Sequence, residues 1–290
     1  MDGKSSARDT VTFIGNATTL LRLGDFTLLT DPNFLHAGQR AYLGYGAWTR
    51  RLTEPARQLA ELPRPDAVVL SHLHGDHFDR IARRELPRAV PIITTRQAQR
   101  RLRRWRFTEA TGLDTWQSHD WFRGQQRLRI TAVPGRHGPG PVDRLLPAVM
   151  GSMIDLEEGG VRRLRLYVTG DTLYRPALAQ IPERFPDVDA MLIHLGGTRL
   201  LGLLLTMDGR QGAELTQLVR PRVTVPIHFD DYRVFTSPLS DFVDEVARRG
   251  VASAVRPITR GETVELPHAP AAGGIATVGE LSAEPRTGGV

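Results

Sequence analysis

The segment Ser71 to His77 constrains the fold and function of this chain more than any other. It places three imidazoles and one carboxylate within six consecutive positions, 72–77, directly after the apolar run 67–70. A buried strand that ends in such a loop presents a metal ion well, because the strand fixes the backbone while the loop aims the side chains. Protonated histidines this close would also repel one another, and a cation relieves that repulsion. We therefore predict a metalloprotein; the alternative is a polar loop of solvated histidines without an ion.

Three other strand-like segments also end in potential ligands. One such residue follows each segment, namely His137 after 128–133, Asp171 after 164–169 and His228 after 223–227. The glycine before Asp171 allows a close approach of the backbone, and a carboxylate at that point can bridge two ions. This repeated placement predicts that the remaining ligands converge on the cluster at 72–77.

With these residues assembled, the sequence resembles the metallo-β-lactamase superfamily. The matching pattern is His72-x-His74-x-Asp76-His77, then His137, Asp171 and His228, and the similarity runs from about Val11 to about Leu266. Within the superfamily, the chain looks most like the branch with L-ascorbate-6-phosphate lactonase and N-acyl-phosphatidylethanolamine phospholipase D. The resemblance implies an α/β fold, an αββα four-layer sandwich, in one domain over 11–266. We expect flexible ends at 1–10 and 267–290.

The resemblance also implies a role for each ligand. One metal would be held by His72, His74 and His137, and the other by Asp76, His77 and His228, with Asp171 bridging the two. One departure is visible, because Asn16 stands where many relatives carry a histidine. Any role of that position in the site is therefore in doubt.

The ligand chemistry predicts a hydrolase. Nitrogen and oxygen ligands without a thiolate favour Zn²⁺, with Mn²⁺ or Fe²⁺ as alternatives. Two such cations lower the pKa of a shared water to about 7, which yields a bridging hydroxide as nucleophile. Asp171 would position the ions, and either Asp76 or a second metal-bound water would carry the proton to the leaving group. We expect cleavage of an ester, lactone or phosphodiester of a small or lipid-derived substrate.

Two alternative functions stay open, a nuclease or nucleic-acid-binding member of the superfamily and a non-catalytic metal-binding protein. A bridging Asp171 argues against the latter, since structural sites are closed and hold a single ion. Against the nuclease, the chain carries no appended domain or long basic arm for a polymer. The arginine-rich run 96–106 could grip phosphate, but a solvated helix face is the preferred interpretation.

Several other residues allow two interpretations each. His194 lies near the end of the strand predicted at 189–195 and is either a substrate contact or a hydrogen-bonded core imidazole. The apolar segment 200–207 is preferably a buried strand; otherwise it forms a wall for an acyl group, with Leu203 as a tentative substrate contact. Asp208 is predicted to cap a helix. The pair Asp230 and Asp231 would either orient His228 or lie on the surface.

Composition adds the expected location. The chain has no cysteine, which excludes disulfides, and its first nine residues are polar without an apolar signal core. No run has membrane-spanning length. We therefore expect a cytoplasmic protein. Hydrophobic periodicity predicts strands at 11–15, 18–23, 26–30, 66–70, 127–133, 149–156, 163–169, 189–195, 223–227 and 262–266, and helices at 79–86, 94–104, 209–219 and 238–250.

Overall fold

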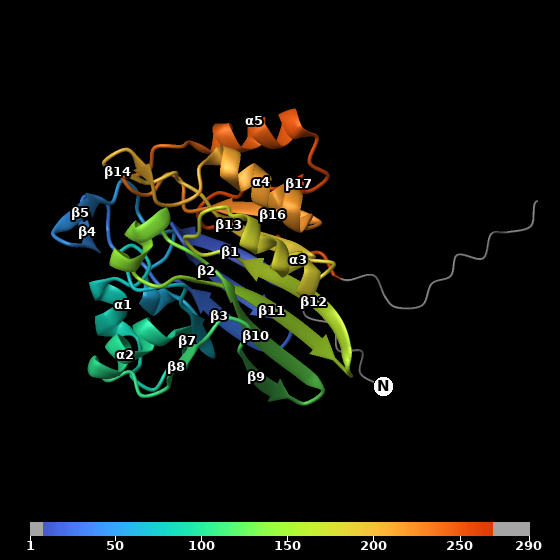
Figure 1. Ribbon diagram of the computed structural model, residues 1–290. Coiled ribbons are helices and arrows are strands. Elements are labelled where there is room, and N and C mark those ends of the chain that lie inside the picture. Colours follow the sequence, from blue (N-terminus) through green and yellow to red (C-terminus); the bar gives the residue numbers. More distant parts are fainter. Residues whose placement is uncertain (1–7, 269–290) are drawn as a thin grey trace, which may run out of the picture.

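Two seven-stranded sheets face each other in the computed structural model, which describes residues 8–268 (Figure 1). The first sheet has the order β18 (Thr263–Glu265), β1 (Thr10–Gly15), β2 (Thr18–Leu23), β3 (Phe26–Thr30), β6 (Ala67–Val69), β7 (Ile92–Thr95) and β8 (Ala110–Leu113). The second has the order β17 (Ala254–Val255), β16 (Val223–Ile227), β13 (Ala190–His194), β12 (Val161–Val168), β11 (Met150–Glu158), β10 (Gln126–Pro134) and β9 (Ser118–Arg123). The flexible ends predicted at 1–10 and 267–290 lie almost wholly outside the described residues.

Successive side chains of a strand point to opposite faces of its sheet, and this alternation builds three cores. Leu28 of β3 and Leu192 of β13 enter the core between the two sheets. Their neighbours Leu29 and Ile193 point outward into separate cores. Both faces of each sheet are therefore apolar, so each sheet needs a second covering layer.

Helices supply that layer on both outer faces (Figure 1). The first sheet is covered by α1 (Arg80–Glu85) and α2 (Arg96–Arg104), and the second by α3 (Gln180–Arg184), α4 (Gly209–Val219) and α5 (Leu239–Arg249). Asp208 caps α4 as predicted, since its side chain accepts a hydrogen bond from the backbone N–H of Gln211. The layers follow the order helix, sheet, sheet, helix, which confirms the αββα sandwich.

Two short hairpins lie outside the large sheets. One consists of β4 (Arg40–Gly44) and β5 (Ala47–Arg50), which the sequence did not predict because its arginines and exposed aromatics break the apolar alternation. The other consists of β14 (Arg199–Leu200) and β15 (Leu203–Leu204). The buried strand predicted at 200–207 is therefore wrong. Leu201 and Gly202 adopt positive φ in a tight reversal, and the side chain of Leu201 is 95% exposed.

The candidate site lies where the strands of both sheets end. The segments that follow β3, β6, β12 and β16 meet there, and the backbone N–H of Met150 donates to the carbonyl of Ser71 across the two sheets. Gly170 packs tightly at this junction, because a Cβ on it would lie 2.8 Å from the carbonyl oxygen of Met150. Among residues 8–268, no helix has the length and apolar character needed to cross a bilayer.

Candidate metal centre

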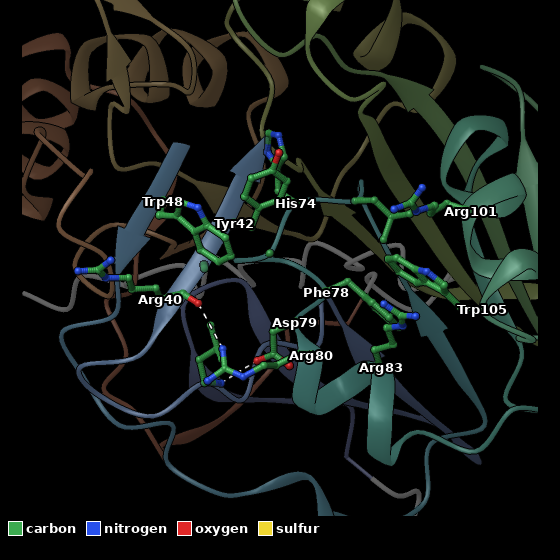
Figure 2. Close-up of a pocket in the computed structure, with 14 residues that line it drawn as sticks. Arg40, Tyr42, Trp48, His74, Phe78, Asp79, Arg80, Arg83, Arg101 and Trp105 are labelled. Carbon is green, nitrogen blue, oxygen red and sulfur yellow. Dashed lines mark hydrogen bonds between the residues drawn. The ribbon is translucent and has the colours of Figure 1, made fainter. Parts of the chain in front are cut away.

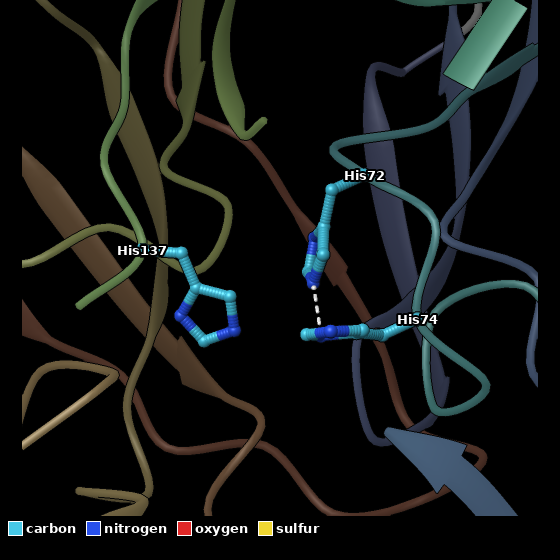
Figure 3. A group of neighbouring side chains, drawn as sticks. All are labelled: His72, His74 and His137. Carbon is cyan, nitrogen blue, oxygen red and sulfur yellow. Dashed lines mark hydrogen bonds between the residues drawn. The ribbon is translucent and has the colours of Figure 1, made fainter. Parts of the chain in front are cut away.

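Three of the predicted ligands form one group at the end of β6 and β10. One ring nitrogen from each of His72, His74 and His137 lies within 4.8 Å of the other two (Figure 3). His72 Nε2 faces His74 Nδ1 at 3.1 Å. The loop after β6 supplies two of these side chains and the turn after β10 supplies the third, so the group joins the two sheets. Its geometry offers three nitrogen lone pairs to a single cation.

A second group lies beside the first. It consists of Asp76, His77 and His228, whose ligand atoms are also mutually within 4.8 Å. Asp76 Oδ2 lies 3.6 Å from His228 Nε2 and 3.9 Å from His77 Nε2. The backbone of His228 has a φ of 62°, a left-handed conformation that turns its ring back from the end of β16 toward the loop after β6.

Asp171 lies between the two groups. Its Oδ2 is 3.2 Å from His77 Nε2 and 4.0 Å from His72 Nε2, and its Oδ1 is 3.6 Å from His228 Nδ1. One carboxylate thus faces a histidine from each group. The structure therefore brings all seven predicted ligands to one place.

Hydrogen bonds behind the rings fix how the imidazoles point. His137 donates from Nδ1 to the carbonyl of Leu205 at 2.9 Å, and His228 donates from Nδ1 to the carbonyl of Leu195 at 3.3 Å. The hydroxyl of Ser71 lies 3.0 Å from His72 Nδ1. In each case Nε2 is left to face the centre, as is usual for metal-bound histidines.

Two residues that the sequence interpretation did not assign to the site support it from behind. Asp31 accepts from His77 Nδ1 at 3.0 Å and from both the backbone N–H and the hydroxyl of Ser71. Asn16 donates from Nδ2 to the backbone carbonyl of Asp76 at 2.6 Å. The Thr-Asp-Pro turn that contains Asp31 was visible in the sequence, but its contact with His77 joins residues 46 positions apart.

The electrostatics of the two groups differ. Burial lowers the pKa of His72 well below its ordinary value, lowers the pKa of His74 to about 3 and lowers the pKa of His137. The rings are therefore neutral, the state in which imidazole can bind a metal. Burial also disfavours protonation of His77, but Asp171, Asp76 and Asp31 outweigh it and raise the pKa of His77. The centre therefore stabilises positive charge between its carboxylates.

Unsatisfied buried atoms show that the donor set fits a metal. Asp76 Oδ1, Asp171 Oδ1 and His228 Nε2 are buried without a hydrogen-bond partner. Leaving such groups unpaired costs about 1–3 kcal/mol each. A divalent cation would satisfy them and would reduce the repulsion between the two carboxylates.

His194 is fully buried beside this centre. Its Nδ1 lies 3.2 Å from the hydroxyl of Thr169, and its Nε2 lies 3.4 Å from Asp31 Oδ2. Its ring stacks on that of His77 at a centroid distance of 6.0 Å. These contacts favour the interpretation of His194 as a hydrogen-bonded core imidazole over that of a substrate contact.

The acidic pair after β16 does not contact the ring of His228. Asp231 is buried and accepts from the backbone N–H of Asn16 at 2.7 Å, while Asp230 is exposed and pairs with Arg260. The predicted surface position therefore holds for Asp230, whereas the predicted contact with the ring of His228 is made by the carbonyl of Leu195 instead. Asp231 supports the site through the backbone of Asn16, whose carbonyl accepts from the N–H of His228 at 3.0 Å.

Comparison with known proteins identifies similar chains. The Beta-lactamase superfamily domain matches residues 27–229. A UPF0173 metal-dependent hydrolase of Deinococcus radiodurans is 27% identical over 257 residues, which cover 87% of this chain and 97% of the relative. Another, from Anaeromyxobacter sp. (strain K), is 30% identical over 230 residues and covers 77% of this chain and 75% of the relative.

Solved structures share the fold. An isothiocyanate hydrolase from Delia radicum gut bacteria has a TM-score of 0.75 at 19% identity, and the alignment covers 89% of this chain and 99% of that one. A metallo hydrolase from the hyperthermophilic archaeon Ignicoccus hospitalis has a TM-score of 0.65 at 22% identity, with 89% and 98% covered.

Proposed function

Because the chain belongs to the metallo-β-lactamase superfamily, with relatives named metal-dependent hydrolases, we propose that it is a hydrolase with two divalent cations at the candidate centre. His72, His74 and His137 would hold one cation, and Asp76, His77 and His228 the other. The position of Asp171 between the groups is the observation that carries this proposal.

The chain's own residues set up the reaction. When bound, the cations would lower the pKa of a shared water toward about 7 and polarise the bond under attack. Asp171 and the five histidines would fix the positions of the cations, and Asp31 keeps the ring of His77 oriented. Asp76 is the acid–base residue of the proposal, since its buried carboxylate has one oxygen without a hydrogen-bond partner.

The proposed metal is Zn²⁺, because the five imidazoles and two carboxylates form a nitrogen-rich set without thiolate. Mn²⁺ and Fe²⁺ suit the same ligands and are the alternatives. The relative supply of these metals in the cell would then decide which of them occupies the site. The proposed location of the enzyme in the cytoplasm comes from composition and stays a prediction.

The proposed substrate is a small or lipid-derived ester, lactone or phosphodiester. The resemblance to the branch with L-ascorbate-6-phosphate lactonase and N-acyl-phosphatidylethanolamine phospholipase D supports this range. The apolar hairpin of β14 and β15 supports an acyl group, because it carries the exposed Leu203 and leads into Leu205, whose carbonyl holds His137. One structural relative is named an isothiocyanate hydrolase, so isothiocyanates belong among the test substrates.

The test is elemental analysis of the purified protein together with a panel of lactones, phosphodiesters, N-acyl compounds and isothiocyanates. The proposal expects two divalent cations per chain and hydrolysis of at least one class of these compounds. Chelation should abolish this activity, and added metal should restore it. A protein that binds one ion and hydrolyses nothing would instead favour the non-catalytic alternative. Cleavage confined to nucleic acid would favour the nuclease.

A further inference from the structure

A cavity of about 460 Å³ borders the loop that carries His74 (Figure 2). We call it the arginine–aromatic pocket, and its principal lining residues are Arg40, Arg80, Arg83, Arg101, Trp48 and Trp105, together with Tyr42. Its size falls within the range of about 300–1,000 Å³ that is typical of small-molecule sites. Helix α2 exposes its arginines to solvent, as predicted, and one of them, Arg101, also lines this cavity.

The positive charge of the pocket is not neutralised from within. Among the described residues, no carboxylate forms an ion pair with Arg40, Arg80, Arg83 or Arg101. The acidic residue of the lining, Asp79, uses its carboxylate to accept backbone N–H groups of Leu35 and Ala82. Arg80, Arg83 and Arg101 therefore bring positive charge to one hollow, which attracts an anion.

Two of these arginines are held in place by an aromatic ring. The guanidinium carbon of Arg83 lies 4.2 Å from the ring centroid of Trp105, and that of Arg101 lies 5.3 Å from it. Phe78 stacks on Trp105 from the buried side at 6.2 Å. A guanidinium that rests on a ring loses less freedom when it binds an anion, and its N–H groups stay available for bidentate bonds to oxygens.

The opposite wall is aromatic and uncovered. Tyr42 and Trp48 pack against each other on the β4–β5 hairpin at a centroid distance of 4.9 Å, yet they stay 45% and 59% exposed. Figure 2 places these two rings on one side of the hollow and Arg83, Arg101 and Trp105 on the other. Exposed rings of this size favour stacking with a planar group.

The pocket is joined to the candidate metal centre. Leu73, His74 and Gly75 line it, and the backbone N–H of Gly75 donates to the carbonyl of Tyr42 at 2.9 Å. A Cβ on Gly75 would lie 2.7 Å from the backbone nitrogen of Tyr42, so the hairpin rests directly on the ligand loop. His74 also has the largest exposed fraction of the seven ligands, 8%. A ligand in the pocket would therefore lie beside the reaction centre.

We propose that the arginine–aromatic pocket binds the non-reacting part of the substrate, a planar ring that carries a phosphate-like anionic group. The arginines on α1 and α2 hold the anion, and Tyr42 and Trp48 cover the ring. This inference rests on the proposed hydrolase function and narrows its substrates to anionic compounds with a planar body. The volume of about 460 Å³ is that of a small-molecule site.

Isothermal titration calorimetry of the full-length protein with three probes tests the proposal. Phenylphosphonate carries both the ring and the anion and resists hydrolysis, methylphosphonate carries the anion alone, and benzyl alcohol carries the ring alone. We expect phenylphosphonate to bind at least tenfold more tightly than either partial probe. Each titration is repeated after the metal has been removed by chelation. Binding in the pocket should persist in the metal-free protein, whereas binding to the cations should be lost.

Two double variants with equal charge loss locate the binding. The variant Arg83→Gln with Arg101→Gln removes two pocket arginines, and we expect it to weaken phenylphosphonate at least tenfold. The variant Arg100→Gln with Arg104→Gln is the matched control, because it removes two exposed arginines of α2 outside the lining. It should change the dissociation constant less than twofold.

Several results would overturn the proposal: no binding of phenylphosphonate, equal weakening in both double variants, or equal affinity for benzyl alcohol. Tighter binding of a single-stranded oligonucleotide with a steep salt dependence would assign the surface to nucleic acid instead. Metal content is measured on the same samples. A protein with phenylphosphonate bound in the pocket but without two cations would contradict the proposed function and leave the pocket standing.

Discussion

Asp31 Oδ2 lies 3.0 Å from His77 Nδ1, on the opposite side of the ring from Asp171. Asp31 has a φ of 33° and is 1% exposed, so the turn after β3 holds its carboxylate in the protein interior. His77 therefore keeps its proton on Nδ1 and presents Nε2 to the centre. The turn that follows β3 of the first sheet therefore orients the ring of a candidate ligand.

Replacing Asp31 should weaken metal binding without removing a ligand. We expect Asp31→Asn to lower the affinity for Zn²⁺ by about 10–100-fold, the usual effect of losing a carboxylate behind a metal-bound histidine. Competition with a chromophoric chelator measures it. Asp189→Asn is the matched control, since Asp189 is equally buried but bonds to the backbone of Arg165. Equal losses in both variants would mean that Asp31 acts only through stability.

Asn16 should matter more than the sequence suggested, where the departure from histidine put a role of this position in doubt. Its side chain donates to the carbonyl of Asp76, and its φ of 54° disfavours most side chains. We expect Asn16→Ala to lower the free energy of unfolding by about 1–3 kcal/mol in urea titrations. Asn16→Gly accepts the same backbone conformation and isolates the lost hydrogen bond. No change in either variant would remove Asn16 from the account.

The buried pair of Arg51 and Asp231 should stabilise the loops around the centre. Arg51 is fully buried, and its Nη2 lies 3.4 Å from Asp231 Oδ1. Removing one member of such a pair costs about 3–5 kcal/mol. We expect Arg51→Met to reach the lower end of this range, because Arg260 also contacts Asp231. Urea unfolding at pH 7 measures the loss of unfolding free energy, and a loss below about 1 kcal/mol would contradict this role of the pair.

The contribution of Asp231 should also depend on pH. Burial opposes its ionisation, but Arg260 and Arg51 outweigh it and lower the pKa of Asp231. A carboxyl group with a lowered pKa in the folded state stabilises the protein above its unfolded pKa of about 3.9, and this contribution is lost as the pH falls through the lowered pKa. The stability difference between wild type and Arg51→Met should therefore narrow below pH 4. A gap that widens on acidification would be inconsistent with this sign.

Leu203 should set the preference for acyl chains if the β14–β15 hairpin contacts substrate. For a series of test esters, KM should fall as the chain lengthens, by at most about fourfold for each methylene that becomes buried. Leu203→Gln should flatten that dependence. Val161→Gln is the control, since Val161 is similarly exposed at the start of β12, outside the β14–β15 hairpin. Identical KM values along the series would end the acyl proposal.

Local sequence patterns made much of this site predictable. The cluster at 72–77 and the ligands His137, Asp171 and His228 each follow an apolar strand, and the ends of neighbouring strands converge in space. Contacts across long separations were not predictable, because Asp31 and Asn16 meet the ligand loop through turns that carry no periodic signal. The apolar run at 200–207 was misread for a related reason, since hydrophobicity alone does not distinguish a buried strand from an exposed hairpin.

The most direct test of the two-cation centre is the metal content of wild type and Asp171→Ala, measured by mass spectrometry on samples saturated with Zn²⁺ and then dialysed. The account predicts two ions per chain in wild type and no more than one in the variant, with hydrolysis lost. Circular dichroism confirms that the variant is folded. Two retained ions and full turnover in Asp171→Ala would contradict the central claim.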